Sequence, residues 1–188
     1  FLMSNIDLTI LRLPKVKTID DSFLYNNTKL KILDLPNLEI FGLDFLKRNT
    51  DLELLFLPKI KDLNNTKLLQ NNESLRSLYA PNTEEIGHIT FPKKTKLKSL
   101  YFPKLKFQET VAQSYQFITS ISENKQIKHL YISQDNNIAK IQGSNLLRNL
   151  RNSLLESSEL DILENIDEHK EIAKRESEGL HELYMSFE

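Results

Sequence analysis

The sequence predicts an α/β solenoid, in which short parallel strands stack into one concave sheet and irregular or helical segments form the convex side. Three observations predict it: a leucine pattern that recurs about every 22 residues, a second pattern with Asn at a fixed place, and a C-terminal part where both patterns stop. We therefore expect two parts, a solenoid of about six repeats over residues 1–142 and a helical segment over residues 143–188.

The leucine pattern reads Leu-x-x-Leu-x-Leu-Pro. Its six copies, the last of them looser, begin at Leu8, Leu30, Leu52, Leu75, Leu97 and Ile127. In each copy, a short strand would point alternate side chains to opposite faces. One unit cannot bury its leucines alone, so we expect neighbouring units to stack and merge them into a continuous core. The proline after each strand ends the strand pairing, because proline lacks the backbone donor.

The second pattern places an asparagine three residues before a leucine copy, at Asn5, Asn27, Asn49, Asn72 and Asn124. An asparagine at a fixed place suits a buried turn, because its amide can satisfy neighbouring backbone groups. We expect these side chains to hold consecutive turns together.

The chain begins with Phe1-Leu2-x-x-Asn5, which matches Phe23-Leu24-x-x-Asn27, the second half of the next repeat. We therefore expect further repeats upstream, and an N-terminal targeting segment that is not part of this piece. The leucines of the first turn would then form an uncovered apolar edge, through which the chain would fray or associate with itself.

After Ile138 the repeats stop, and the spacing of apolar residues becomes helical. One helix is expected on the convex side around Val111 to Ile121, a second over Leu146 to Leu155 and a third from Ser158 onward. The C-terminal helices either cap the solenoid or lead to another domain. Residues 1–142 carry a net charge of +5 and residues 143–188 one of −6. This acidic part would either fold back on the solenoid or form a solvated spacer.

The repeats resemble a known family. The unit that runs from Leu30 through Leu33, Leu35, Pro36, Gly42, Phe45 and Asn49 to Leu52 resembles leucine-rich repeats of the BspA-like, or Treponema-type, subclass. The resemblance covers residues 1–142, and the chain departs from it by having Asn in place of Cys and by an irregular fifth unit. It implies a curved solenoid that binds other macromolecules, often in bacterial surface or host-directed proteins, and implies no particular ligand.

Composition and motifs argue against several other functions. Without cysteine, there is no disulfide framework, thiolate zinc site or thiol nucleophile. The four histidines lack metal-ligand spacing, and no phosphate-binding loop or nucleophile motif occurs. A net charge of −1 argues against a nucleic-acid binder, and no apolar run reaches the length of a membrane span. We expect no enzymatic activity, cofactor or metal in this chain.

The candidate binding residues lie on the strands, at positions that face away from the leucine core. The position between the last two leucines reads Arg12, Asp34, Phe56, Tyr79, Tyr101 and Tyr131. The position before the middle leucine reads Ile10, Ile32, Leu54, Ser77, Ser99 and His129. Because parallel strands lie about 4.8 Å apart, the four aromatic residues would form one ridge beside an aliphatic column.

We predict that a protein partner binds this surface, through Phe56, Tyr79, Tyr101, Tyr131, Leu54, Ile32, Arg12 and Asp34. One alternative is that the ridge only stabilises the sheet; another is that the aromatics stack on sugars, as in a glycan-binding adhesin. The Lys- and Asn-rich, Cys-free composition and the resemblance favour a bacterial surface or secreted virulence protein. The main rival is the targeting domain of a host-directed effector whose catalytic domain lies outside this piece.

A further column alternates in charge without a break. It lies three residues past each proline and reads Lys17, Glu39, Lys61, Glu84 and Lys106. Stacked in register, each acid would lie between two lysines, so we expect this column to stabilise the stack of turns.

Overall fold

The computed structural model describes residues 2–64, 68–69, 71–86, 91, 95–105, 117, 120–121, 124, 126–127 and 129–132, the last four by their backbone alone. The helical segment expected over residues 143–188 lies outside this description. So does most of the helix expected around Val111, although Phe117, Ser120 and Ile121 are described as helical and buried. The domain boundary at 142/143 therefore stays a prediction.

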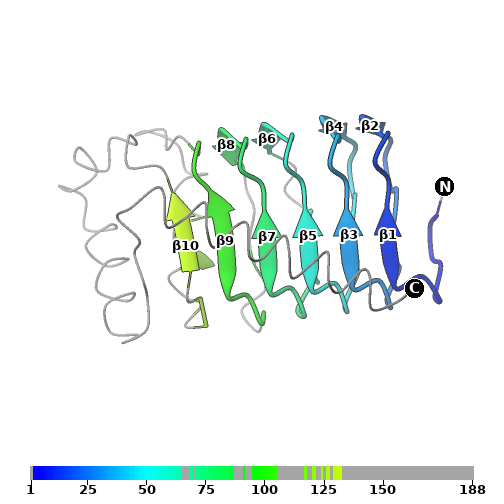
Figure 1. Ribbon diagram of the computed structural model, residues 1–188. Coiled ribbons are helices and arrows are strands. Elements are labelled where there is room, and N and C mark those ends of the chain that lie inside the picture. Colours follow the sequence, from blue (N-terminus) through cyan, green and yellow to red (C-terminus); the bar gives the residue numbers. More distant parts are fainter. Residues whose placement is uncertain are drawn as a thin grey trace.

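The main feature is a six-stranded parallel sheet with the order β1-β3-β5-β7-β9-β10 (Figure 1). Its strands are β1 (Ile10–Arg12), β3 (Ile32–Asp34), β5 (Leu54–Phe56), β7 (Ser77–Tyr79), β9 (Ser99–Phe102) and β10 (His129–Ile132). Each strand pairs with the strand of the next repeat, at equivalent positions. The predicted solenoid of stacked parallel strands is confirmed.

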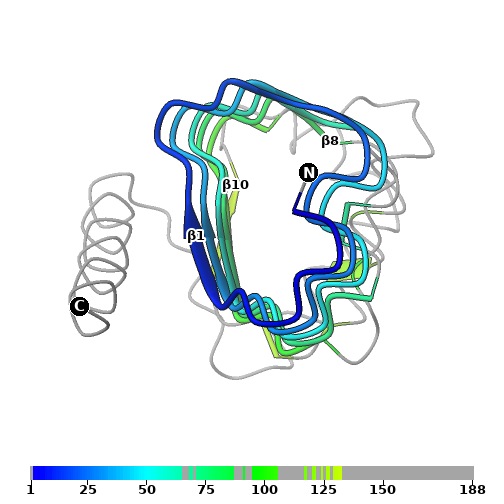
Figure 2. The ribbon, with the colours of Figure 1, turned by 90° about the vertical axis from the view of Figure 1, so that its right-hand side faces the viewer.

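Shorter strands follow the proline turns. β2 (Thr18–Ile19) pairs with β4 (Ile40–Phe41), and β6 (Asp62–Leu63) pairs with β8 (Glu85–Ile86), so two small parallel sheets run beside the main one. Viewed along the solenoid, the turns overlie one another as one outline with the main sheet along one side (Figure 2). The face of the main sheet that points away from the enclosed core, expected to be concave, is called the outer face below.

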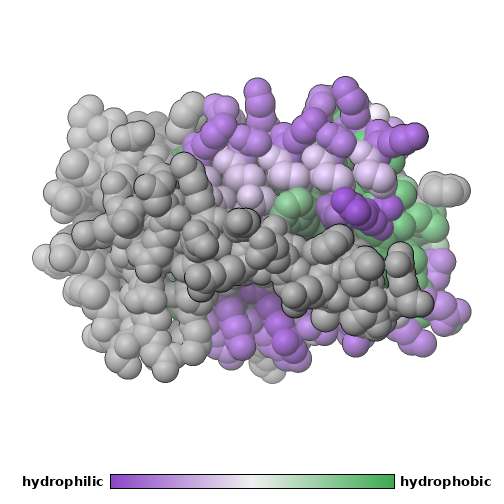
Figure 3. All heavy atoms as spheres, viewed as in Figure 1, coloured by the Kyte–Doolittle hydropathy of each residue, from purple (hydrophilic) through white to green (hydrophobic). Residues whose placement is uncertain are grey.

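The leucines of the pattern fill the core. Leu30, Leu33 and Leu35 of the second turn are completely buried, and the third turn repeats this burial. In the first turn, the equivalent Leu8 and Leu11 are only partly buried against the same core. Hydrophobic surface accordingly gathers toward the β1 end of the molecule (Figure 3). The first turn is less well covered, as predicted, whereas self-association through it stays a prediction.

The side opposite the main sheet is irregular in the described turns rather than helical. Three alternate residues of one turn, Ser22, Leu24 and Asn26, have positive φ angles of 59°, 58° and 62°. Their equivalents one repeat later, including the buried Leu46 at 59°, have the same conformation. An α-helix requires negative φ at every residue, so this alternation excludes one there. The described part of the solenoid is therefore strand and turn with almost no helix, the helical residues in it being Phe117, Ser120 and Ile121. The α/β class stays a prediction.

The buried asparagines connect these turns. The Asn27 and Asn49 side-chain amides donate hydrogen bonds to the carbonyl oxygens of Leu2 and Leu24, each at 2.8 Å. Asn72 donates in the same way to the Leu46 carbonyl at 3.3 Å. Each acceptor belongs to a leucine with positive φ in the preceding turn. The predicted role of asparagine is confirmed: it satisfies buried backbone oxygens and holds consecutive turns together.

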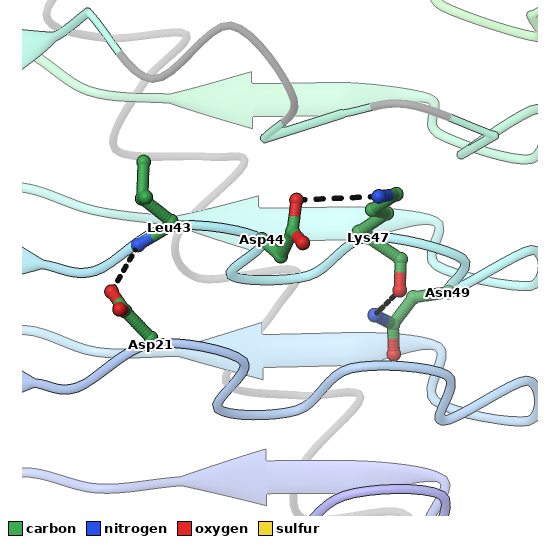
Figure 4. A network of polar contacts seen from close by, with 5 residues as sticks. All are labelled: Asp21, Leu43, Asp44, Lys47 and Asn49. Carbon is green, nitrogen blue, oxygen red and sulfur yellow. Dashed lines mark hydrogen bonds and ion pairs between the residues drawn. The ribbon is translucent and has the colours of Figure 1, made fainter.

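Gly42 lies where two consecutive turns approach each other closely. A Cβ atom at this position would overlap the backbone of Asp20 and Asp21 and the Asp21 carboxylate. That carboxylate accepts a hydrogen bond from the Leu43 backbone N–H at 2.6 Å (Figure 4). The glycine is therefore required by space, since its own φ is not in the left-handed region.

Candidate functional site

The main sheet places the predicted site residues in two columns on its outer face. Strand pairing aligns Arg12 with Asp34, Asp34 with Phe56, and Phe56 with Tyr79. It continues from Tyr79 to Tyr101 and to the backbone of Tyr131. The second column, from Ile10 through Leu54 to His129, is aligned by the same pairs. The register predicted from the repeats is therefore confirmed. The binding role of these residues stays a prediction.

Three of the aromatic side chains form a stack, called the aromatic ladder below: Phe56, Tyr79 and Tyr101. The ring centroids of Phe56 and Tyr79 lie 4.5 Å apart with an interplanar angle of 4°. Those of Tyr79 and Tyr101 lie 4.9 Å apart at 7°. These distances match the spacing of neighbouring strands, about 4.8 Å. The Tyr131 side chain lies outside the described residues.

This stacking decides which part of each ring is accessible. All three rings are partly exposed, but the stacked contacts cover both faces of Tyr79 and one face of each outer ring. The ladder therefore presents mainly ring edges and the phenolic oxygens. Burial raises the pKa of the Tyr101 phenol above its ordinary value of 10.0.

The β1 and β3 end of the outer face is different. The Arg12 Nε atom lies 2.9 Å from a carboxylate oxygen of Asp34, and only 8% of Asp34 is exposed. Burial raises the pKa of Asp34, while the nearby Arg12 guanidinium opposes that shift. In the neighbouring column, Ile32 is 4% exposed and Leu54 is partly exposed. Asp34 and Ile32 thus offer almost no surface to a partner, whereas Arg12 and Leu54 offer some.

Two basic residues that the sequence reasoning did not select border the ladder. Arg76 and Lys98 precede the outward serines of β7 and β9 and are both exposed. The Arg76 Nε atom lies 3.2 Å from a carboxylate oxygen of Glu53. The signal was present in the sequence, because Arg-Ser-Leu-Tyr at 76–79 and Lys-Ser-Leu-Tyr at 98–101 are near copies, followed by Lys-His-Leu-Tyr at 128–131.

The first two residues of the alternating column form an ion pair between consecutive turns. The Lys17 ammonium lies 3.7 Å from the Glu39 carboxylate, and both side chains are well exposed. Beside it, Asn37 and Asn82 each donate to the carbonyl oxygen of a proline in the preceding turn, at 2.6 and 2.7 Å. These contacts join consecutive turns. Lys106 lies outside the described residues.

Comparisons of this chain with protein-family models, curated proteins and solved structures find no match. Within the part of the chain that the structure describes, no helix is long and apolar enough to cross a membrane. The same residues contain no group of three or more histidine or carboxylate side chains that could hold a metal ion. The functional argument therefore rests on the outer face itself.

Proposed function

We propose that this chain is a recognition module of the BspA-like leucine-rich-repeat type, which binds a protein partner through the outer face of its main sheet. One observation carries the proposal: the aromatic ladder crosses three consecutive turns and is partly exposed. Tyrosine and phenylalanine are enriched at protein interfaces because they offer a large contact area at low cost in side-chain entropy. A rigid repeat scaffold holds these residues in position without a partner.

The geometry of the ladder favours a protein over a glycan. A sugar ring packs its C–H groups against an open aromatic face, and the stack covers most of those faces. Ring edges and hydroxyl groups suit the mixed apolar and hydrogen-bonding contacts of a protein surface. We therefore prefer protein binding to the glycan-binding alternative.

The cellular setting follows only from the resemblance. We propose that the module belongs to a bacterial surface or secreted protein and that its partner is a host protein. The repeat type supports this setting. A module of an effector delivered into host cells would use the same face.

The experiment is an affinity capture from host-cell extracts, read by mass spectrometry and repeated with the isolated partner. Wild type is compared with the double variant Tyr79→Ala/Tyr101→Ala and with the matched control Tyr25→Ala. Tyr25 is also partly exposed, but it lies in the turns opposite the sheet, near the Lys47 and Arg48 side chains. We expect the double variant to lose the partner and the control to retain it, with unchanged circular dichroism in both. Equal capture by the double variant and wild type would refute the proposal.

A further inference from the structure

The outer face carries the same group of side chains on two neighbouring strands. β7 and β9 pair so that Ser77 aligns with Ser99 and Tyr79 with Tyr101. The basic residues Arg76 and Lys98 immediately precede these strands, at equivalent positions. Each row therefore has an exposed basic residue and a partly exposed tyrosine, whereas Ser77 is partly exposed and Ser99 is buried. These two rows are called the basic–tyrosine rows below.

The ring edges in these rows are electrostatically positive. An aromatic ring has a negative face and a positive edge, and the stacked geometry turns the edges outward. The phenolic hydroxyl group of Tyr101 is also a hydrogen-bond donor. Edges and hydroxyl groups together favour contact with the oxygen atoms of a partner, such as its backbone carbonyl oxygens.

The charged neighbours have the same preference. Arg76 and Lys98 border the ladder on one side, and the exposed Lys59 and Lys104 follow its strands on the other. Glu53 is the acid that reaches Arg76, and half of the Arg76 side chain remains exposed in that ion pair. Positive charge therefore borders the ladder on both sides in the described residues, on a solenoid region whose net charge is +5.

We propose that the partner segment bound at the basic–tyrosine rows is acidic, an Asp- and Glu-rich stretch of protein that crosses β7 and β9. This inference rests on the proposed function and names the chemistry of its partner. The carboxylates lie beside Arg76 and Lys98, and the backbone or apolar side chains lie along the ring edges. Complementary charge speeds the encounter and fixes the register of such a complex.

Other polyanions fit this surface less well. Single-stranded nucleic acids bind proteins by stacking successive bases on open aromatic faces, and here the stack covers both faces of Tyr79 and one face of each outer ring. A sulfated glycan lacks apolar side chains to match the ladder. Nucleic acid and sulfated glycan therefore serve as competing ligands in the test.

The test measures fluorescence anisotropy of a labelled 12-residue peptide of Asp, Glu and Leu, with a matched peptide that has Asn and Gln in place of the acids. Both are titrated with the full 188-residue chain. We expect the acidic peptide to bind, and its affinity to fall about tenfold between 50 and 300 mM salt because the contact is ionic. The neutral peptide is expected to bind at least tenfold more weakly. Equal binding of the two peptides, or no binding of either, would overturn the inference.

Variants locate the contact. Arg76→Gln/Lys98→Gln is expected to weaken acidic-peptide binding about tenfold, whereas Lys98→Arg retains it. The control Lys17→Gln/Lys29→Gln makes the same change in net charge at exposed lysines of the first two turns, whereas the ladder begins on β5. An equal loss in the two double variants would mean general attraction rather than a site. Tighter binding of labelled oligo-dT or heparin at the same salt would overturn the choice of an acidic protein.

The two proposals can fail separately. If the Tyr79→Ala/Tyr101→Ala variant loses its captured partner while Arg76→Gln/Lys98→Gln retains it, the outer face binds a protein that is not acidic, and only this inference falls. If both double variants retain the partner, the proposed function falls as well.

Discussion

The hydrogen bond from Asn49 to the turn before it can be tested by the substitution Asn49→Ala. The Asn49 side chain is completely buried, and its amide donates to the Leu24 carbonyl at 2.8 Å and, more weakly, to that of Lys47 at 3.5 Å. The Leu24 oxygen belongs to a buried residue with positive φ. The substitution leaves that oxygen without this donor in the interior.

The expected loss follows from these contacts. A buried polar group that loses its partner costs about 1–3 kcal/mol, and the space vacated by the amide adds to this. We expect Asn49→Ala to lower the free energy of unfolding by about 2–3 kcal/mol. Asn5 occupies the equivalent position in the exposed first turn, where its side-chain oxygen accepts from the Asp7 and Leu8 backbone N–H groups. Water can replace those bonds, so Asn5→Ala should cost below about 1 kcal/mol.

The assay is urea unfolding followed by far-ultraviolet circular dichroism and tyrosine fluorescence, with both variants at equal concentration. Agreement between the two probes is required before free energies are compared, since repeat proteins can unfold in parts. Equal losses for Asn5→Ala and Asn49→Ala would refute the reasoning, because the loss would then not depend on whether the hydrogen bond made by the asparagine is buried.

Four further substitutions test other parts of the structure. Gly42→Ala should lower the free energy of unfolding by about 1–3 kcal/mol, and with it the melting temperature, because the new methyl group meets the backbone of the preceding turn. An unchanged melting temperature would contradict this. Glu39→Lys should cost up to about 1 kcal/mol at low salt and less at high salt, because it replaces the exposed pair with Lys17 by repulsion; a salt-independent loss would contradict it. Leu78→Ala should lower the free energy of unfolding, measured in urea, by about 2–5 kcal/mol, because Leu78 is completely buried. It changes no side chain of the outer face. Burial raises the pKa of Asp34, so the folded chain binds the Asp34 proton more tightly than the unfolded chain, and the stability that this proton contributes is lost as pH rises through the raised pKa. In thermal melts between pH 3 and 7, Asp34→Asn should remove this part of the pH dependence. Wild-type and variant curves of stability against pH that run parallel would contradict this.

The sequence by itself determined the repeat, the strands and their register. Copies about 22 residues apart place equivalent residues side by side once the turns stack, and the two-residue period of a strand then assigns each position to the core or the outer face. Both outward columns, including the alignment of Phe56 with Tyr79 and Tyr101, could therefore be predicted. The buried asparagines were predictable for the same reason, because every repeat needs the same backbone groups satisfied.

The tertiary structure alone decided how much of each predicted residue is accessible. Ile32 and Asp34 share columns with the partly exposed Leu54 and Phe56, yet are almost fully buried, because burial depends on what surrounds a side chain in space. The parallel stacking of the aromatic rings, which hides their faces, is likewise a matter of side-chain geometry that the register leaves open. The left-handed residues opposite the sheet were also unpredictable, since Leu24 and Leu46 are ordinarily helix formers. Their backbone conformation is compatible with the fold because the next turn supplies an asparagine to each carbonyl, a contact that exists only when the turns are stacked.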